Sequence, residues 1–194
     1  MADYEYGRIM ILADRLEKAG VAPEIAARIM EGGESIKKTA TPGKKAAWLG
    51  EAMKRMDALL DEPTRRKVRE ECACCLGGKR QEVSKSIGRK YESLEDRIKA
   101  SNETRFVFGH SVTMQDDGRV LVSFAPEGLE SYRCVCLPKA KEPVSITYCY
   151  CCGGHVKHHL QNALGRKLSL EVRSSALESG GKRPCTFLFA IEEE

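Results

Sequence analysis

The sequence predicts an α+β protein in which a helical first half precedes an antiparallel sheet. Apolar residues recur at helical spacing through the first hundred positions, and Gly and Pro punctuate these runs. After Asn102 the pattern changes to short strand-like segments joined by turn signals. Their order is strand, strand, helix, strand, strand, which favours an antiparallel sheet with helices on one side. We expect a helical region over 1–101 and an α+β region over 102–194, or one domain that combines them.

The helical half is expected to hold five helices. Asp3 suits the N-cap of the first helix, and Pro63 suits the first turn of the fourth. The fourth helix is expected to carry a group of cysteines at its C-terminal end and to stop at Gly77. A break is expected in the fifth near Gly88. The expected helices are 3–20, 23–32, 44–60, 63–76 and 79–100.

The second half is expected to begin with a hairpin. Asp116-Asp117-Gly118 is a turn signal, and apolar runs flank it at 106–108 and 120–122. A helix is expected over 151–164, because its apolar residues share one stripe and Gly165 ends it. Two closing strands are expected at 167–173 and 185–191.

Composition and charge exclude several classes of protein. No stretch reaches the roughly 20 apolar residues of a membrane helix, and the N-terminus lacks a secretory signal, so a cytoplasmic protein without a membrane partner is expected. The net charge of +4 is spread over several helices, whereas nucleic-acid modules concentrate basic charge on one face, so nucleic acid is not an expected partner. A small-molecule ligand is the expected partner, and the sequence allows a homo-oligomer.

Nine cysteines, most of them in three tight groups, are the chemical signature of the chain. An odd number in a reducing compartment argues against a disulfide framework. Neighbouring thiolates can instead converge on a soft metal ion. Packing is the alternative, since free cysteine is a small, usually buried apolar residue. The groups are Cys72-Ala-Cys74-Cys75, Cys134-Val-Cys136 and Cys149-Tyr-Cys151-Cys152, and Cys185 stands alone.

Two of the groups could form the halves of a four-sulfur site. On a continuous helix Cys72 and Cys75 lie on one ridge, with Cys74 pointing elsewhere. In an extended segment Cys134 and Cys136 project to the same face. Together they would give the tetrahedral geometry of structural zinc.

The third group could supply a mixed sulfur and nitrogen site. His155 follows Cys151 and Cys152 by one helical turn, and such ligands suit zinc or, alternatively, an iron–sulfur cluster. The histidines could equally cover a polar helix face. The candidate metal ligands are Cys72, Cys75, Cys134, Cys136, Cys149, Cys151, Cys152, His155 and Cys185.

Three segments of the C-terminal half form a recognisable pattern: Tyr148 to His159, the strand 168–173 and the closing Cys185-Thr-Phe-Leu-Phe. With this pattern the C-terminal half resembles the 4-vinyl reductase domain family of small ligand-binding domains. The same residues are similar to bacterial proteins described as amino-thiazoline carboxylate hydrolases. The resemblance implies a ligand pocket and a zinc site in which Cys151 or Cys152 is the first ligand and Cys185 the last. The family's middle ligands have no match, because Ser174, Ser175 and Leu177 stand there and the nearest acids are Glu171 and Glu178.

Three functions follow from these observations. The first is a small-molecule-binding or sensor-like protein with a thiolate-bound metal, most simply zinc. The second is a hydrolase with a zinc or cysteine site, although HExxH, GxSxG, Walker and Rossmann motifs are absent from the sequence. The third is an iron–sulfur or thiol-redox protein, although the sequence lacks the CxxCxxC spacing of ferredoxins and its adjacent Cys-Cys pairs are unusual for thioredoxin-like chemistry. The sequence therefore fits both a binding protein and an enzyme.

Overall fold

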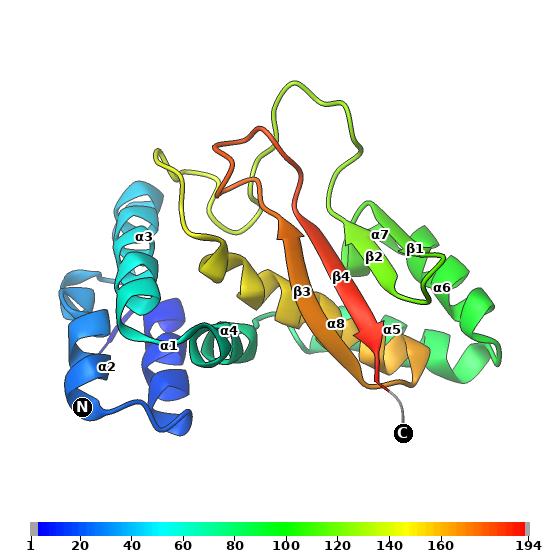
Figure 1. Ribbon diagram of the computed structural model, residues 1–194, viewed down its shortest axis with the longest axis horizontal. Helices are drawn as coiled ribbons and strands as arrows, with labels where there is room; N and C mark the ends of the chain where they lie inside the picture. The colour runs from blue at the N-terminus through cyan, green and yellow to red at the C-terminus, as the bar shows by residue number, and fades with distance from the viewer. Residues whose placement is uncertain (1–3, 193–194) are drawn as a thin grey trace.

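The computed structural model describes residues 4–192 and confirms the α+β class. Helices α1 to α4 form a lobe on one side, and a four-stranded antiparallel sheet backed by α8 and α5 forms the other (Figure 1). The predicted cap Asp3 lies outside the described residues, and the first helix begins at Gly7. Within residues 4–192 no helix is both long and apolar enough to cross a membrane.

In the N-terminal lobe α1 to α3 lie close to their predicted ranges, whereas α4 ends at Glu71, before the predicted stop at Gly77. Thr41 and Asp61 accept hydrogen bonds from Lys44 N and Thr64 N, so side-chain caps fix the starts of two helices. Pro63 lies in the first turn of the fourth helix, as predicted. The elements of the lobe are α1 (Gly7–Lys18), α2 (Pro23–Met30), η1 (Gly33–Ser35), α3 (Pro42–Leu59) and α4 (Glu62–Glu71).

The predicted fifth helix is two helices, followed by the short helix α7, and its break lies at Ser93 rather than Gly88. The Ser93 hydroxyl accepts from Asp96 N and starts a new helix. Gly88 lies inside α5 and does not break it. Its lack of a side chain allows the helix to pack closely against the backbone at Asn162, because a Cβ there would lie 2.5 Å from Asn162 O. The helices are α5 (Gly78–Lys90), α6 (Leu94–Glu103) and α7 (Arg105–Phe108).

The sheet has the order β1-β2-β4-β3, with every neighbouring pair antiparallel. The central strand β4 buries Phe187 and Phe189, and Phe187 lies opposite Val122 of β2. Three of the four predicted strands are confirmed in place. The strands are β1 (Ser111–Met114), β2 (Val120–Ser123), β3 (Leu168–Ser174) and β4 (Thr186–Ile191).

The prediction of a strand at 106–108 was wrong. Residues 105–108 form the short helix α7, and the first strand of the hairpin is β1. Met114 pairs with Val120 across the turn. The strand that pairs with β2 is therefore the one immediately before the turn, Ser111–Met114, and it does not reach back to 106–108. Gly109, with a φ of +119°, turns the chain from α7 toward β1.

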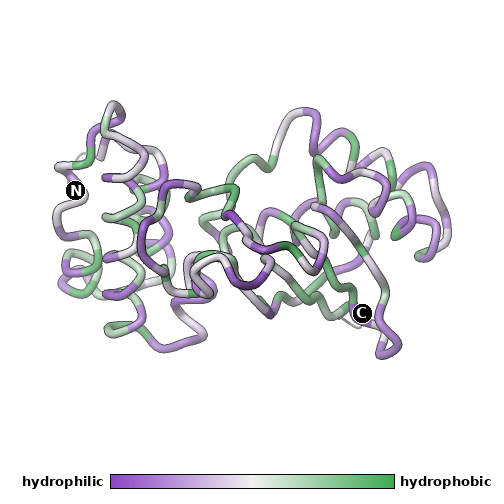
Figure 2. Tube along the Cα trace, turned by 90° about the horizontal axis from the view of Figure 1, so that it is seen from above, coloured by the Kyte–Doolittle hydropathy of each residue, from purple (hydrophilic) through white to green (hydrophobic). Residues whose placement is uncertain are grey.

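Helix α8 (Tyr150–Leu164), preceded by the short helix η2 (Ile146–Cys149), joins the two parts of the molecule. It contacts α4, α5 and β3, and one apolar core runs from the N-terminal helices to the sheet (Figure 2). Its first turns fit tightly: a Cβ on Gly154 would lie 2.3 Å from Glu70 O, and one on Gly153 would lie 2.5 Å from Leu170 Cδ2. This approach brings the residues after α4 to the start of α8.

Candidate functional site

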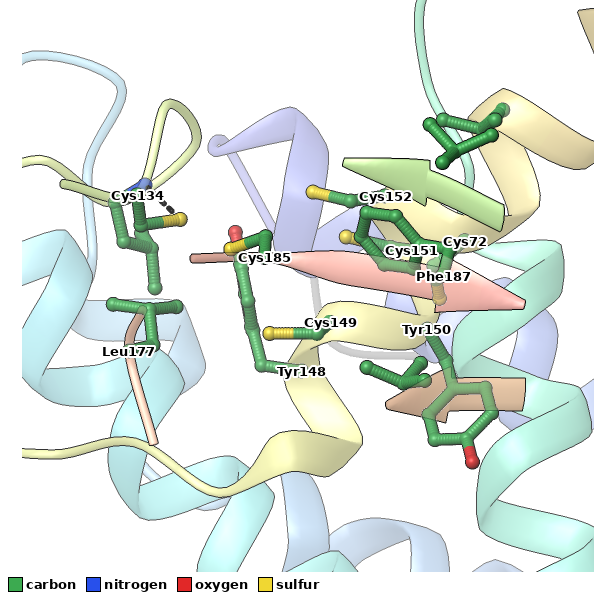
Figure 3. Close-up of a cluster of buried hydrophobic side chains, with 14 of the residues drawn as sticks. Cys72, Cys134, Tyr148, Cys149, Tyr150, Cys151, Cys152, Leu177, Cys185 and Phe187 are labelled. Carbon is green, nitrogen blue, oxygen red and sulfur yellow. Dashed lines mark hydrogen bonds between the residues drawn. The ribbon is translucent and has the colours of Figure 1, made fainter. Parts of the chain in front are cut away.

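The structure gathers cysteines from three distant segments beside the first turn of α8. One segment directly follows α4, the second lies in the irregular chain between β2 and η2, and the third is α8 itself. Figure 3 shows Cys72, Cys151 and Cys152 of this group beside the central strand. We call the group the thiol cluster. Its members are Cys72, Cys74, Cys136, Cys151 and Cys152.

Two features describe the geometry of the thiol cluster. The Sγ atoms of Cys136 and Cys152 are 3.2 Å apart, in direct contact. Next to Cys136 lies a buried void of about 10 Å³, which Cys72, Cys74 and Cys151 also line. All nine cysteines of the chain are free thiols.

The predicted pairing of Cys72 with Cys75 on one helix ridge was wrong. Helix α4 ends at Glu71, Cys72 is its C-cap, and Cys75 adopts a left-handed φ of +61° and is exposed. Because the helix does not continue, Cys74 turns inward in place of Cys75. Cys74 lines the same void as Cys72.

Cys134, Cys149 and Cys185 lie near the start of β4, outside the thiol cluster, and Cys75 is exposed. Cys149 Sγ lies 2.9 Å from Ser175 Oγ, and the neighbouring Cys185 thiol and burial raise the pKa of Cys149 well above its ordinary value. Cys134 lies beside Leu177 (Figure 3), and its sulfur accepts the backbone N–H of Cys136 at 3.4 Å. The thiol that neighbours Cys185 is thus Cys149, where the family resemblance implied Cys151 or Cys152.

Two arginines place positive charge against the thiol cluster. Arg69 is buried, 3% exposed, and donates to the carbonyl oxygen of Tyr148 at 3.3 Å, while its Nε has no hydrogen-bond partner. Arg8 donates to the carbonyl oxygen of Cys136 at 2.7 Å and to the Tyr148 hydroxyl oxygen at 3.0 Å. Within residues 4–192 neither arginine forms an ion pair with a carboxylate. A buried cation without a carboxylate favours negative charge on the nearby sulfurs.

The surrounding thiols and charged groups shift the pKa values of Cys136 and Cys152 in opposite directions. The thiols of Cys134 and Cys152, with Arg8 and His155, lower the pKa of Cys136 well below its ordinary value. Contacts with Cys136 and Cys151, together with burial, raise the pKa of Cys152 well above its ordinary value. These shifts favour a Cys136 thiolate beside a protonated Cys152.

A cavity of about 390 Å³ opens onto this pair, and we call it the arginine cavity. Cys136 and Cys152 line its wall, and Arg8 contributes positive charge to it. Further lining comes from α5, α7 and the chain around Val135. These parts of the wall include Arg80, Arg105, Phe106, Phe124 and Val135.

The histidines of α8 hold the backbone that carries the cysteines. His155 Nδ1 lies 2.9 Å from Cys74 O and His159 Nε2 lies 3.1 Å from Cys75 O, so each ring donates to a backbone carbonyl. Burial lowers the pKa values of both His155 and His159. His155 thereby positions the segment between α4 and α5 against α8.

No group of three or more His, Cys, Asp or Glu side chains with a metal-holding arrangement occurs among residues 4–192. The zinc and iron–sulfur expectations stay predictions.

The sequence did not indicate that Arg8, Arg69 and Cys74 belong to the site. No spacing rule links Arg8 to a cysteine more than 120 residues away, whereas Cys74 was excluded only by assuming an unbroken helix. Gly153-Gly154 was a usable signal, because glycine inside a helix costs about 1 kcal/mol and suggests a packing reason.

The fold and site define an α+β protein with a buried thiol cluster at the junction of a helical lobe and an antiparallel sheet. The chain matches a family of unknown function, DUF6144, over residues 8–188, and it belongs to that family. No curated protein and no solved structure matches it significantly.

Proposed function

We propose that the protein is a thiol-redox protein whose reactive pair is Cys136 and Cys152. The observation that carries the proposal is the 3.2 Å contact between the two sulfurs at the wall of an open cavity. A disulfide bond is about 2.05 Å long, so oxidation needs the sulfurs to approach by only about 1.2 Å. Their segments are an irregular loop and the first turn of a helix, and the loop can supply that movement.

The two cysteines have the different properties that thiol–disulfide exchange requires. Cys136 is partly exposed at the cavity, and its lowered pKa supplies the thiolate that attacks. Cys152 is buried and protonated, which suits a second thiol that attacks the Cys136 sulfur after the first exchange. Arg8 stabilises the attacking thiolate.

The test is oxidation of the fully reduced protein with one equivalent of a diazenecarboxamide oxidant, followed by peptide mapping. We expect a disulfide that joins Cys136 to Cys152. Replacing either residue by Ser should remove that crosslink. Cys185→Ser is the matched control: its hydroxyl can still accept the Ala176 N–H that the sulfur accepts at 3.4 Å, so the crosslink should persist. Oxidation that gives only other pairings would contradict the proposal.

A metal held by the thiol cluster is the second candidate function. The observation that favours it is the void of about 10 Å³ lined by Cys72, Cys74, Cys136 and Cys151. Zinc with four thiolates carries a net charge of −2, and Arg8 and Arg69, which line the same void, would neutralise it. The sulfurs would have to close to about 2.3 Å from the ion.

Elemental analysis of the protein purified under reducing conditions tests this candidate. Zinc bound in the thiol cluster should be present at one ion per chain, lost in Cys74→Ser and retained in Cys185→Ser. A visible chromophore with iron would identify an iron–sulfur cluster instead. Reduced protein that takes up no metal would exclude this candidate and leave the dithiol.

A further inference from the structure

Positive charge surrounds the arginine cavity on several sides. Arg8 comes from α1, Arg80 from α5 and Arg105 from α7, so three separate elements each contribute a guanidinium. Within the described chain no aspartate or glutamate lines the cavity. Arg80 uses its Nε to donate to the Phe106 carbonyl oxygen at 3.1 Å, which fixes the side chain and leaves its terminal N–H groups for a ligand. Such a site attracts anions, and guanidinium groups pair well with carboxylates.

Apolar surface lies beside this charge. Phe106 is 50% exposed and Val135 is 71% exposed, and both line the cavity. Phe124 adds a second aromatic ring, held edge-on to Phe187 with ring centroids 5.0 Å apart. Large apolar side chains left open to solvent beside a cavity are typical of a ligand site. The volume of about 390 Å³ suits a small molecule rather than a protein segment.

We propose that the arginine cavity selects a small disulfide that carries carboxylate groups. This inference rests on the proposed redox function. The arginines bind the carboxylates, and the exposed apolar residues cover the body of the molecule. This arrangement places the disulfide against the Cys136 sulfur, which lines the same cavity.

The exchange balances without another reactant. The Cys136 thiolate attacks one sulfur of the ligand, a mixed disulfide forms, and the first thiolate leaves. Cys152 then loses its proton to solvent and attacks the Cys136 sulfur, which releases the second thiolate. The two protein thiols are oxidised to one disulfide, and the ligand disulfide is reduced by two electrons to two thiols.

Two aromatic disulfide probes of different charge test the selection. The dianion 5,5′-dithiobis(2-nitrobenzoate) and neutral 4,4′-dithiodipyridine each release a thiol that absorbs light. The quantity measured is the Cys136-dependent second-order rate constant, obtained by subtracting the rate of Cys136→Ser. In the double variant Arg80→Gln, Arg105→Gln we expect the rate with the dianion to fall about tenfold. The rate with the neutral probe should stay within about twofold, which also shows that the variant is folded.

The matched control is Arg89→Gln, an exposed arginine of the same helix α5 that does not line the cavity. It should change neither rate. Equal losses with both probes, or no loss with the dianion, would overturn the selection while leaving the dithiol intact. If Cys136→Ser reacts as fast as the unaltered protein with both probes, the redox function itself fails.

Discussion

Gly154→Ala should lower the free energy of unfolding by about 2–4 kcal/mol, because a methyl group has no room there. The added Cβ would lie 2.3 Å from Glu70 O, a backbone atom that cannot rotate away. Helix α8 or the end of α4 must therefore shift. Since Cys72 and Cys74 directly follow α4, the shift also moves them away from Cys151.

Gly50→Ala is the control for this substitution. Gly50 also lies inside a helix, α3, but a Cβ there would meet Val144 Cγ2 at 3.6 Å, an ordinary contact. Alanine is the better helix former, so this variant should match the unaltered protein or gain up to about 1 kcal/mol. Urea unfolding under reducing conditions compares the two. Equal stability of the two variants would show that the contact of α8 with α4 is looser than described.

Alkylation of Cys136 by iodoacetamide should be nearly independent of pH between 8.5 and 6.5. A thiol with an ordinary pKa near 8.5 loses thiolate over this range, and its rate falls about 50-fold. The pKa of Cys136 is lowered by its neighbouring thiols, Arg8 and His155, so the thiolate persists as the pH falls. We expect a change of less than about threefold, measured by quantitative mass spectrometry of the peptide that contains Cys136.

Arg8→Met separates the role of the cation from that of the thiols. Removing the guanidinium should raise the pKa of Cys136 and restore part of the fall in rate toward low pH. Arg89→Met, which removes an exposed charge from α5, should leave the profile flat. A profile of the unaltered protein that already follows an ordinary thiol would contradict the assignment of Cys136 as the attacking residue.

Local signals predicted most of the fold. Pro63 marked a helix start, Gly165 with a φ of +66° marked a helix end, and the turn at Asp116-Asp117-Gly118 marked the hairpin. The strand placed at 106–108 failed because three consecutive apolar residues do not distinguish a strand from one helical turn. Strand β3 was found because its apolar residues alternate with polar ones over a longer stretch, and β4 because it is a longer apolar run that follows a turn.

The candidate site was predictable in its composition and not in its pairing. Grouped cysteines indicated a shared site, yet the partner of Cys136 is Cys152, and sequence spacing does not contain that contact. The contact depends on tertiary packing, because the loop after β2 must return to the start of α8. The end of α4 decided whether Cys74 or Cys75 faces inward, and helix ends are uncertain by one or two residues.

A redox titration in defined thiol–disulfide buffers, read out by mass spectrometry of trapped thiols, tests the central claim most directly. The account predicts one reversible two-electron transition assigned to Cys136 and Cys152, with a midpoint above about −300 mV, where exchange-active disulfides lie. Cys185→Ser should keep this transition. Thiols that stay reduced at every potential, or a transition that survives Cys152→Ser, would contradict the account.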